Sequence, residues 1–408
     1  MKDDFKLLRA SHWLSDCLTF ASLTKVLCTG ILCVLLVAGL SPFHSPENQV
    51  KWMENKSGLQ FSRYSSILGS TAFHGKSASD GTSESLEVWL VPSSLRSMNT
   101  IVSFDGSDHP GAGFMLRQYK DALIVRQHYI DNYGVPRIES LAVLKALHEG
   151  TPVLVTITLG RRGTAIYLDG VLGEMFSARG TSANNLTGRL VVANSPQAND
   201  SWPGQILGLA IYRSQLTPSR VAENCEGWTK SQRPTILNNE APIALYLFEE
   251  GRGNIVHNQL DSSQDLVIPK HYFVLHPPFL ESIRGDYRPN WHYWEDVSVN
   301  VVGFIPLGFW LAVDFYEVHK IRYPMTTILI VGLLTSLMIE ILQVFLPTRS
   351  SGSTDLITNT LGTAIGIMFY YLPFAQGLLT NYRKLGMRVP FLPSVVADQS
   401  AEKASLSA

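Results

Sequence analysis

Hydrophobic and polar positions divide the chain into two kinds of segment. Apolar residues dominate 26–40 and again 297–372, in runs with few charges that suit membrane-spanning helices. Between them, from 59 to 212, short runs of alternating β-branched and aromatic residues are separated by Gly, Asp, Asn and Pro. Such regularly spaced runs are typical of an antiparallel β-sandwich. The pattern therefore predicts a multi-domain chain, in which a β-sandwich is combined with a transmembrane bundle of about four α-helices.

The predicted spans each have enough residues to cross ~30 Å of hydrocarbon at ~1.5 Å per residue, although the last is close to the lower limit. They cover residues 22–42, 297–315, 325–346 and 355–372. The first has a short uncharged core that also fits a cleaved signal peptide, but no small-x-small cleavage motif follows, which favours a retained anchor. Buried helices of a soluble protein are the alternative for the other three.

Short basic segments predict the orientation of these spans, because Lys and Arg flanking a span favour the cytoplasmic side. They are Lys2, Lys6, Arg9 and Lys25 before the first span, Lys320 and Arg322 between the second and third, and Arg383, Lys384 and Arg388 after the fourth. We therefore expect a cytoplasmic N-terminus at 1–21, an extracytoplasmic domain at 43–290, a bundle at 291–375 and a cytoplasmic tail at 376–408.

Composition narrows the function classes. A net charge of −1 provides no basic field, so no nucleic-acid partner is expected. Only Cys225 lies in the predicted outer domain, which excludes a disulfide within it, and no pair of cysteines has metal-ligand spacing.

The succession of strand segments carries a resemblance. The segments are SLEVWLVP, TIVSFDG, PVLVTITLGRRGTAIYLDG with a tight Asp169-Gly170 turn, GRLVVANS and WPGQILGLAIYRSQLTPSRVAEN. Their order resembles a laminin-G-like, concanavalin A-like jelly roll. The segment IALYLFEEGRGNIVHN at 243–258 resembles the strand that commonly opens such domains, and because it follows the other strands here, we expect it to complete the sandwich. The resemblance implies binding of glycans or proteins and, in some members, calcium. Loop carboxylates offer ligands for calcium, although solvated side chains are the favoured interpretation: Asp105, Asp108, Asp131 and Asp200.

Polar residues inside the apolar segments are the most informative. Counted from the outward ends of the spans, four of them fall ~5–10 Å below the outer surface: Asn300, Glu340, Gln343 and Asn359. Asp355 shares a helix face with Asn359, and Arg349 is the cation in the adjoining loop. Polar groups at this depth are costly unless they face inward and pair. The layer is interpreted either as a pocket for a hydroxyl-rich or amine-bearing headgroup, or as a purely structural set of interhelical bonds.

A second resemblance rests on three segments: NVVGFIPLGFWL, SLMIEILQVFLPTR and DLITNTLGTAIG. Their order and separation resemble the VanZ family of bacterial membrane proteins, which implies a cytoplasmic-membrane location and an association with reduced sensitivity to lipoglycopeptide antibiotics. The resemblance marks Asn300, Glu340, Gln343, Arg349, Asp355 and Asn359 as recurring polar positions. One departure is the stretch after Arg349, where the family often has another acid and this chain has Ser350-Ser351-Gly352-Ser353-Thr354.

These observations favour a non-enzymatic protein of the bacterial cell envelope. Its outer sandwich would bind a glycan or protein, and its bundle would hold a lipid-linked envelope ligand. The alternatives are a membrane enzyme that uses Glu340 or Asp355 as a base on a lipid-linked cell-wall precursor, and a small transporter or scramblase. No nucleophile or histidine shares the polar layer, which argues against the enzyme.

Overall fold

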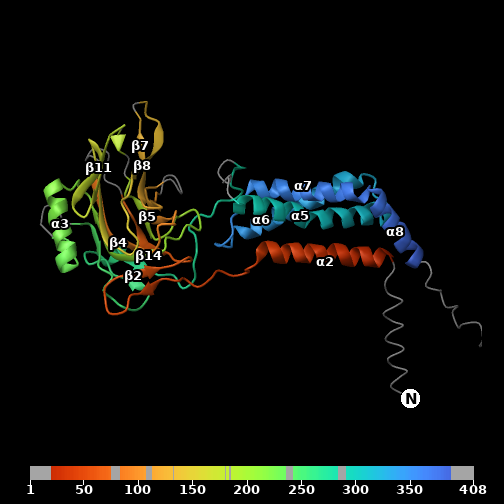
Figure 1. Ribbon diagram of the computed structural model, residues 1–408, viewed down its shortest axis with the longest axis horizontal. Helices are drawn as coiled ribbons and strands as arrows, with labels where there is room; N and C mark the ends of the chain where they lie inside the picture. The colour runs from red at the N-terminus through yellow and green to blue at the C-terminus, as the bar shows by residue number, and fades with distance from the viewer. Residues whose placement is uncertain are drawn as a thin grey trace, which may run out of the picture. The chain divides into compact units, whose positions relative to one another are not determined.

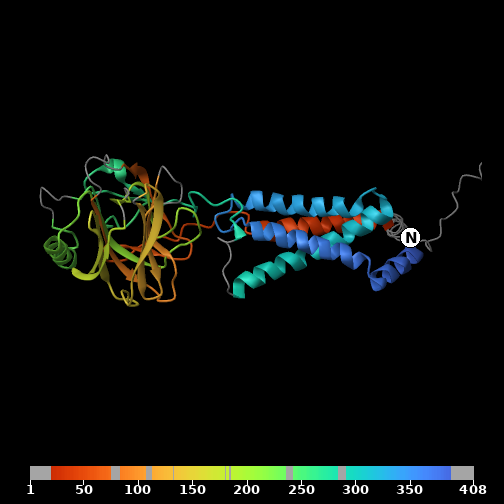
Figure 2. The ribbon, with the colours of Figure 1, turned by 90° about the horizontal axis from the view of Figure 1, so that it is seen from above.

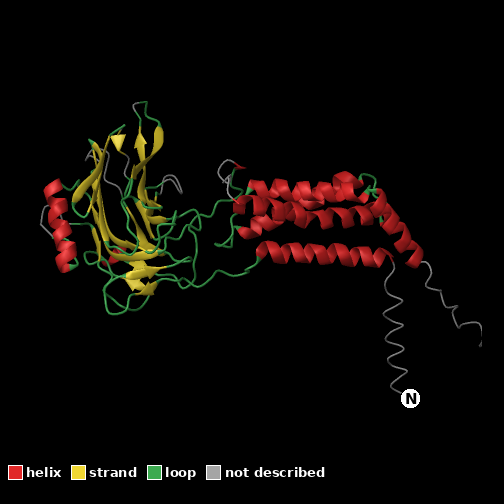
Figure 3. Ribbon diagram, viewed as in Figure 1, coloured by secondary structure: helices red, strands yellow, loops and turns green. Residues whose placement is uncertain are grey.

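The computed structural model describes residues 20–74, 83–106, 113–131, 133–179, 181–182, 185–235, 242–283 and 291–386. The chain forms two compact units, one of residues 1–41, 280–342 and 351–408 and the other of residues 42–279 and 343–350. Strands build the second unit and helices the first (Figures 1 and 3). The predicted N-terminal segment up to residue 19, Asp108 and the tail from residue 387 lie outside the described residues.

The β-unit is a sandwich of two antiparallel sheets. The first sheet has eight strands in the order β1-β2-β14-β4-β9-β10-β11, with β15 paired to β14. Its strands are β1 (Lys51–Trp52), β2 (Leu59–Phe61), β4 (Glu84–Pro92), β9 (Val153–Gly160), β10 (Gly163–Leu168), β11 (Val171–Ser177), β14 (Gly204–Tyr212) and β15 (Ala244–Tyr246). Neighbouring strands in this sheet run antiparallel throughout, as the sequence predicts for a jelly roll.

The second sheet has nine strands in the order β12-β7-β6-β5-β13-β3-β17-β16, with β8 paired to β7. They are β3 (Ile67–Phe73), β5 (Thr100–Asp105), β6 (Met115–Tyr119), β7 (Ala122–Ile130), β8 (Pro136–Val143), β12 (Thr181–Ser182), β13 (Gly188–Val192), β16 (Ile255–Val256) and β17 (Leu266–Val267). The predicted completing segment 243–258 contributes β15 to one sheet and β16 to the other, so the sandwich is closed by residues that follow its main body.

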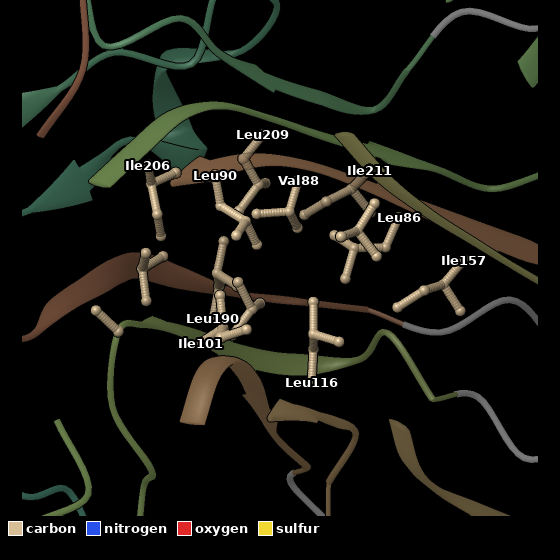
Figure 4. Packing of buried hydrophobic residues seen from close by; sticks show 14 of the residues in the cluster. Leu86, Val88, Leu90, Ile101, Leu116, Ile157, Leu190, Ile206, Leu209 and Ile211 are labelled. Atoms are coloured by element: carbon tan, nitrogen blue, oxygen red, sulfur yellow. The ribbon is translucent and has the colours of Figure 1, made fainter. Parts of the chain in front are cut away.

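Alternating side chains of the two sheets meet in one core. Figure 4 shows Leu86, Val88 and Leu90 of β4 directed toward Leu116 of β6 and Leu190 of β13. All five are completely buried. Alternation places every second residue of β4 in this core and sends the residues between them, Glu87 and Trp89 among them, to the outer face of the first sheet.

The predicted Asp-Gly hairpin joins β10 to β11. Asp169 and Gly170 both have positive φ, at 49° and 79°, which a two-residue type I′ turn requires. The Asp169 carboxylate also accepts a hydrogen bond from the Leu154 backbone N–H at 2.9 Å, which links the turn to β9. The interpretation of Asp169 as a turn residue is thus confirmed.

A helix that the strand pattern did not predict covers the outer face of the first sheet. Helix α3 (Pro218–Ser231) begins at Thr217, whose side chain accepts the Arg220 N–H, and has proline at its first position. It lies against the sheet that contains β4 and β14 (Figure 1). This cover turns part of a nominally solvent-facing surface into a second core.

The covered surface contains a buried carboxylate. Glu87 of β4 is completely buried and accepts hydrogen bonds from Trp228 Nε1 at 2.9 Å, Tyr212 Oη at 2.9 Å and Asn224 Nδ2 at 3.0 Å. Burial raises the pKa of Glu87, while the three donors and the charge of Arg220 act in the opposite direction. Glu87 therefore links α3 to the sheet through hydrogen bonds. Because its pKa is raised overall, the three donors offset only part of the cost of burying its negative charge.

The helical unit contains α2 (Phe20–Leu40), α5 (Trp291–Val313), the π-helical turn η3 (Asp314–Val318), α6 (Pro324–Gln343), α7 (Ser353–Tyr370) and α8 (Pro373–Gly386). Figure 2 shows α2, α5, α6 and α7 running alongside one another, with α8 turning away after α7. Among the described residues, three helices are long and apolar enough to cross a membrane, or four if α7 and the start of α8, bent by 67°, form one span.

The helix ends differ from the predicted spans. The helix predicted at 297–315 starts earlier, at Trp291, and continues through η3 to Val318, while the one predicted at 325–346 ends at Gln343. The other two, predicted at 22–42 and 355–372, each begin and end two residues earlier. Apolar composition marks residues suited to hydrocarbon, whereas a helix ends where its backbone hydrogen bonding ends. The apolar residues after Gln343 therefore belong to a turn.

Glycines allow α5 and α7 to approach closely. A side-chain carbon added at Gly362 would overlap the carbonyl oxygen of Val301, and one at Gly366 would overlap that of Ile305. On the facing helix, Gly308 lies as close to the backbone of Thr363. The four-residue spacing of Gly362 and Gly366 thus places both glycines on the face of α7 that packs against α5.

We predict that Gly366→Leu destabilises the bundle by about 1–3 kcal/mol, because the new side chain forces α7 away from α5. Thermal unfolding of the full chain in detergent measures the change. Gly30→Ala is the matched control, since a carbon added at Gly30 meets no described atom within 4 Å. Equal melting temperatures for the two variants would contradict the close packing of α5 and α7.

We also predict a pH dependence caused by Glu87. Its pKa is raised in the folded state from the usual 4.5, so its contribution to stability is full below that value and is lost as pH rises through the folded-state pKa. Glu87→Gln removes this loss, and the unfolding free energy of the variant should therefore fall less over that window. Thermal unfolding of the full chain across pH tests this, with Glu174→Gln on the exposed face of β11 as control. Parallel pH profiles for wild type and Glu87→Gln would refute it.

Candidate functional site: a buried polar cluster in the helical unit

Four of the six predicted site residues lie in the helical unit, on three different helices. Asn300 is on α5, Glu340 on α6, and Asp355 and Asn359 are on α7. Each forms a hydrogen bond with a residue from another helix or from the turn before α7. The sequence-predicted residues are therefore linked to neighbouring elements, although not all to one another.

Glu340 is positioned at the start of α7. Its side chain is almost completely buried, and its Oε2 accepts the backbone N–H of Gly352 at 2.9 Å. Gly352 is the N-cap of α7 and has no side chain to satisfy the free N–H groups at the helix start. A carboxylate from α6 supplies that acceptor at the positive end of the α7 dipole, which stabilises its charge.

Asn300 and Asp355 connect α5 to the first turn of α7. Asn300 Nδ2 donates to Asp355 Oδ1 at 2.7 Å, and both residues are half-buried. Asp355 lies three residues after the N-cap, where a negative charge also interacts favourably with the helix dipole. Two acidic side chains, Glu340 and Asp355, thus lie at the N-terminus of one helix.

Asn359 lies one turn further along α7 and connects it to α6. Its Nδ2 donates to Ser336 Oγ at 2.9 Å, and both side chains are buried, with 4% and 0% exposure. Among the described residues, Asn359 Oδ1 is a buried acceptor without a hydrogen-bond partner. An unsatisfied buried carbonyl of this kind costs about 1–3 kcal/mol and is a position where a donor group from a ligand would bind favourably.

Residues 280–281, which the predicted polar layer did not include, form hydrogen bonds with the turn before α7. The backbone N–H of Glu281 donates to the Ser351 carbonyl at 2.8 Å, and the Ser353 N–H donates to the Glu281 carbonyl at 3.0 Å. Ser351 Oγ accepts the Leu280 N–H at 3.2 Å. The chain just before α5 thereby forms a short parallel bridge with the turn that presents Gly352 to Glu340.

Gln343 and Arg349, the other two predicted site residues, fall in segment 343–350, which groups with the β-unit. Gln343 is buried as the last residue of α6, and its carbonyl accepts the Leu346 N–H. Arg349 is exposed, and its backbone N–H donates to the Leu346 carbonyl. Asn300, Glu340, Asp355 and Asn359 make the hydrogen bonds described above, and we call these four the polar cluster.

Sequence reasoning missed Ser336 and Glu281. Ser336 precedes Glu340 by four residues on α6, so it shares a helix face with a predicted site residue, and that spacing could have revealed it. Glu281 acts through its backbone, for which no side-chain pattern gives a signal.

A second polar group occurs at the π-helical turn η3. Asp314 is buried and accepts a hydrogen bond from Thr24 Oγ1 of α2 at 3.1 Å, and His319 Nδ1 lies 3.0 Å from its other oxygen. Tyr370 Oη donates to Glu317 at 2.7 Å. These bonds connect η3 to α2 and α7.

The helical unit also contains an apolar cavity of about 660 Å³, lined by residues of α2, α5, α7 and α8. Ile305, Phe309 and Trp310 of α5 form part of its wall. Ile305, the residue of α5 in this wall that is nearest to Asn300 in sequence, follows it by five residues, which is ~8 Å along a helix. The cavity is thus separate from the polar cluster and deeper along α5.

The three loop carboxylates considered for calcium that the structure describes interact with protein groups. Asp105 lies 2.7 Å from His276 Nε2, Asp131 accepts the Tyr133 and Val135 N–H groups and Arg137, and Asp200 accepts Asn99, Thr100 and Arg117. These bonds lower the pKa of Asp131. Within the described residues, no group of three His, Cys, Asp or Glu side chains is arranged to hold a metal ion.

Two family models match the chain. Residues 243–375 match the VanZ/LLP1 family and include the whole polar cluster, and residues 69–222 match the concanavalin A-like lectin/glucanases superfamily. Both resemblances noted in the sequence are thereby confirmed. One part of the chain is thus VanZ-like and another is concanavalin A-like, and this combination fits a protein of the cell envelope.

Solved structures of β-sandwich proteins also match. A protein from Bacteroides ovatus that is described as a carbohydrate binding protein is 13% identical. The match covers 55% of this chain and 58% of that one, with a TM-score of 0.36. The receptor binding domain of botulinum neurotoxin D shares 14%, covering 48% and 56%, with a TM-score of 0.33. A pentraxin from Limulus polyphemus shares 15%, covering 44% and 79%, with a TM-score of 0.30. The chain spans little more than half of the first two. A comparison with curated protein sequences finds no match.

We predict that Glu340→Leu destabilises the helical unit by about 1–3 kcal/mol, because it leaves the buried Gly352 N–H without its acceptor. Glu340→Gln keeps an oxygen at the same position and should lose less. Thermal unfolding in detergent measures both variants, with Ile341→Leu on the exposed face of α6 as control. The role of Glu340 at the α7 N-terminus is refuted if Leu and Gln have the same effect.

Proposed function

We propose that this protein is a membrane-anchored, non-enzymatic binding protein of the bacterial cell envelope. Its helical unit holds the headgroup of a lipid-linked envelope ligand at the polar cluster, and its β-sandwich binds a glycan outside the membrane. The observation that carries the proposal is the buried, unpartnered Oδ1 of Asn359 beside the acidic N-terminus of α7.

The chemistry of the cluster defines the ligand class. Asn359 Oδ1 is an acceptor, and the nearby Asp355 and Glu340 are acids, so a ligand that donates hydrogen bonds suits it best. Hydroxyl and amine groups are such donors, whereas a phosphate alone is an acceptor near neutral pH. A headgroup that carries sugar or amino groups therefore fits better than a simple anion.

The apolar cavity supports a lipid-linked ligand. It lies deeper along α5 than Asn300 and is lined by Ile305, Phe309 and Trp310 together with residues of α7 and α8. A headgroup bound at the polar cluster would leave its hydrocarbon chain at the depth of this cavity. One molecule with a polar head and an apolar tail would then use both features.

The orientation of the protein is part of the proposal. Lys320 and Arg322 follow η3, at the opposite end of α5 from Asn300, and the positive-inside rule assigns that end to the cytoplasm. The polar cluster and the sandwich then face outward from the bacterial cytoplasmic membrane. Binding of a cell-wall precursor there would link the protein to the glycopeptide sensitivity that the resemblance to the VanZ family implies.

A pair of variants separates ligand binding from helix cross-linking. Asn359→Leu and Ser336→Ala both remove the hydrogen bond between α6 and α7, but only Asn359→Leu also removes the free acceptor. We predict that lipid-linked molecules retained by the wild-type protein in mild detergent are reduced about tenfold in Asn359→Leu and little in Ser336→Ala. Mass spectrometry of the extracted lipids measures this.

Melting temperatures of the same preparations serve as the folding control. Equal retention by all three proteins would refute the headgroup site, and equal loss in both variants would show that Asn359 has only a structural role. Conversion of the retained lipid to a product by wild type would favour an enzyme instead.

A further inference from the structure

The outer face of the first sheet carries a pocket that the polar cluster does not involve. It has a volume of about 530 Å³, which lies within the range of small-molecule sites. Its wall includes one aromatic ring, two amides and two opposite charges: Trp89, Gln205, Gln232, Lys56 and Glu149. Of the loop carboxylates considered for calcium, the three that the structure describes do not line it.

Strand alternation and two turns bring these side chains together. Trp89 of β4 faces outward because Val88 and Leu90 face the core, and Gln205 of β14 pairs with Val91 two residues further along β4. Glu149 is brought to the same edge by the turn at Gly150, which has φ of 71° and donates its N–H to the Pro92 carbonyl at 2.9 Å.

The end of α3 supplies another wall. Gln232 is the C-cap of α3 in the left-handed conformation, with φ of 56°, and its N–H donates to the Trp228 carbonyl. Its side-chain Oε1 accepts a hydrogen bond from Ser57 Oγ at 3.3 Å. The pocket therefore exists only where the helix end meets the loop between β1 and β2.

Trp89 provides a fixed apolar surface. Its half-buried indole packs on the fully buried Trp228 with ring centroids 6.3 Å apart and an angle of 50° between the planes. A side chain at Gly208 would overlap the Trp228 ring, so this glycine leaves the space that Trp228 occupies beneath Trp89. A ring held on one side by protein and lining a pocket on the other can receive a ligand with little loss of conformational entropy.

We infer that this pocket is the saccharide-binding site of the β-sandwich, an inference that rests on the proposed glycan-binding role. The C–H face of a sugar ring packs on an indole, while its hydroxyl groups bond to amides, which both donate and accept. Lys56 and Glu149 cancel in charge, so the pocket suits a neutral or zwitterionic sugar. The two amides and two charged side chains in the wall would lose hydrogen bonds to water beside a hydrocarbon chain, and the single cation disfavours a polyanion.

The experiment uses the full chain in lipid nanodiscs on an array of neutral, N-acetylated and anionic oligosaccharides. The strongest oligosaccharide is then titrated by calorimetry against wild type and three variants. Gln205→Ala removes an amide, Gln205→Trp fills the pocket, and Gln215→Ala changes an exposed glutamine outside it. We expect Kd to rise about tenfold or more for both Gln205 variants and to stay within about twofold for Gln215→Ala.

Each outcome has a distinct meaning. Glycan binding that all variants retain would overturn the pocket while leaving the glycan-binding role intact. Wild type that binds no oligosaccharide, on an array where a control lectin binds, would overturn both. Selective binding of anionic sugars would overturn the assigned ligand class. Melting temperatures verify that the Gln205 variants are folded. One variant shortens the side chain and the other enlarges it, so a loss of binding in both is attributed to the pocket itself.

Discussion

The close approach of α5 and α7 is the constraint on which the polar cluster depends. Gly362 and Gly366 let backbone carbonyls of α5 lie where side chains would otherwise be. At that separation the short side chain of Asn300 reaches Asp355 directly. In an apolar environment, where the hydrophobic effect between helices is absent, such packing and the hydrogen bonds that it permits are the main source of cohesion.

The cluster combines structural and binding properties in the same residues. Glu340 caps the start of α7 through Gly352, and Asn359 links α7 to Ser336. Each of these hydrogen bonds links two elements of the bundle. Each also fixes the orientation of the side chain that forms it, and with it the position of the Glu340 carboxylate and of the Asn359 carbonyl oxygen. Asn359 differs because its amide donates to one helix and leaves its carbonyl unused. A bound donor would complete its hydrogen bonding without disturbing the helix contact.

In the β-sandwich, α3 covers part of the outer sheet face, so outward-facing side chains of β4 are not all exposed to solvent. Glu87 and Trp89 both point away from the main core, yet α3 buries the first completely and the second by half. Beneath the helix the Glu87 carboxylate accepts hydrogen bonds from three side chains. At its end, where cover is incomplete, the indole lines a pocket. The same element therefore closes one part of the sheet face and leaves another available to a ligand.

Local patterns in the amino-acid sequence are enough to predict the β-sandwich, the helical bundle and which polar residues lie within apolar segments. Strand alternation, the Asp169-Gly170 turn and the apolar runs are local patterns, and charged or amide groups such as Glu340 and Asn359 stand out in an apolar run without any knowledge of contacts. Tertiary structure decided what those groups bond to. Gly352, Glu281 and the cover over Glu87 depend on residues distant in sequence, whose backbone positions leave no periodic signal in the chain. Hydrogen-bond partners follow from three-dimensional proximity, and only folding brings such residues together.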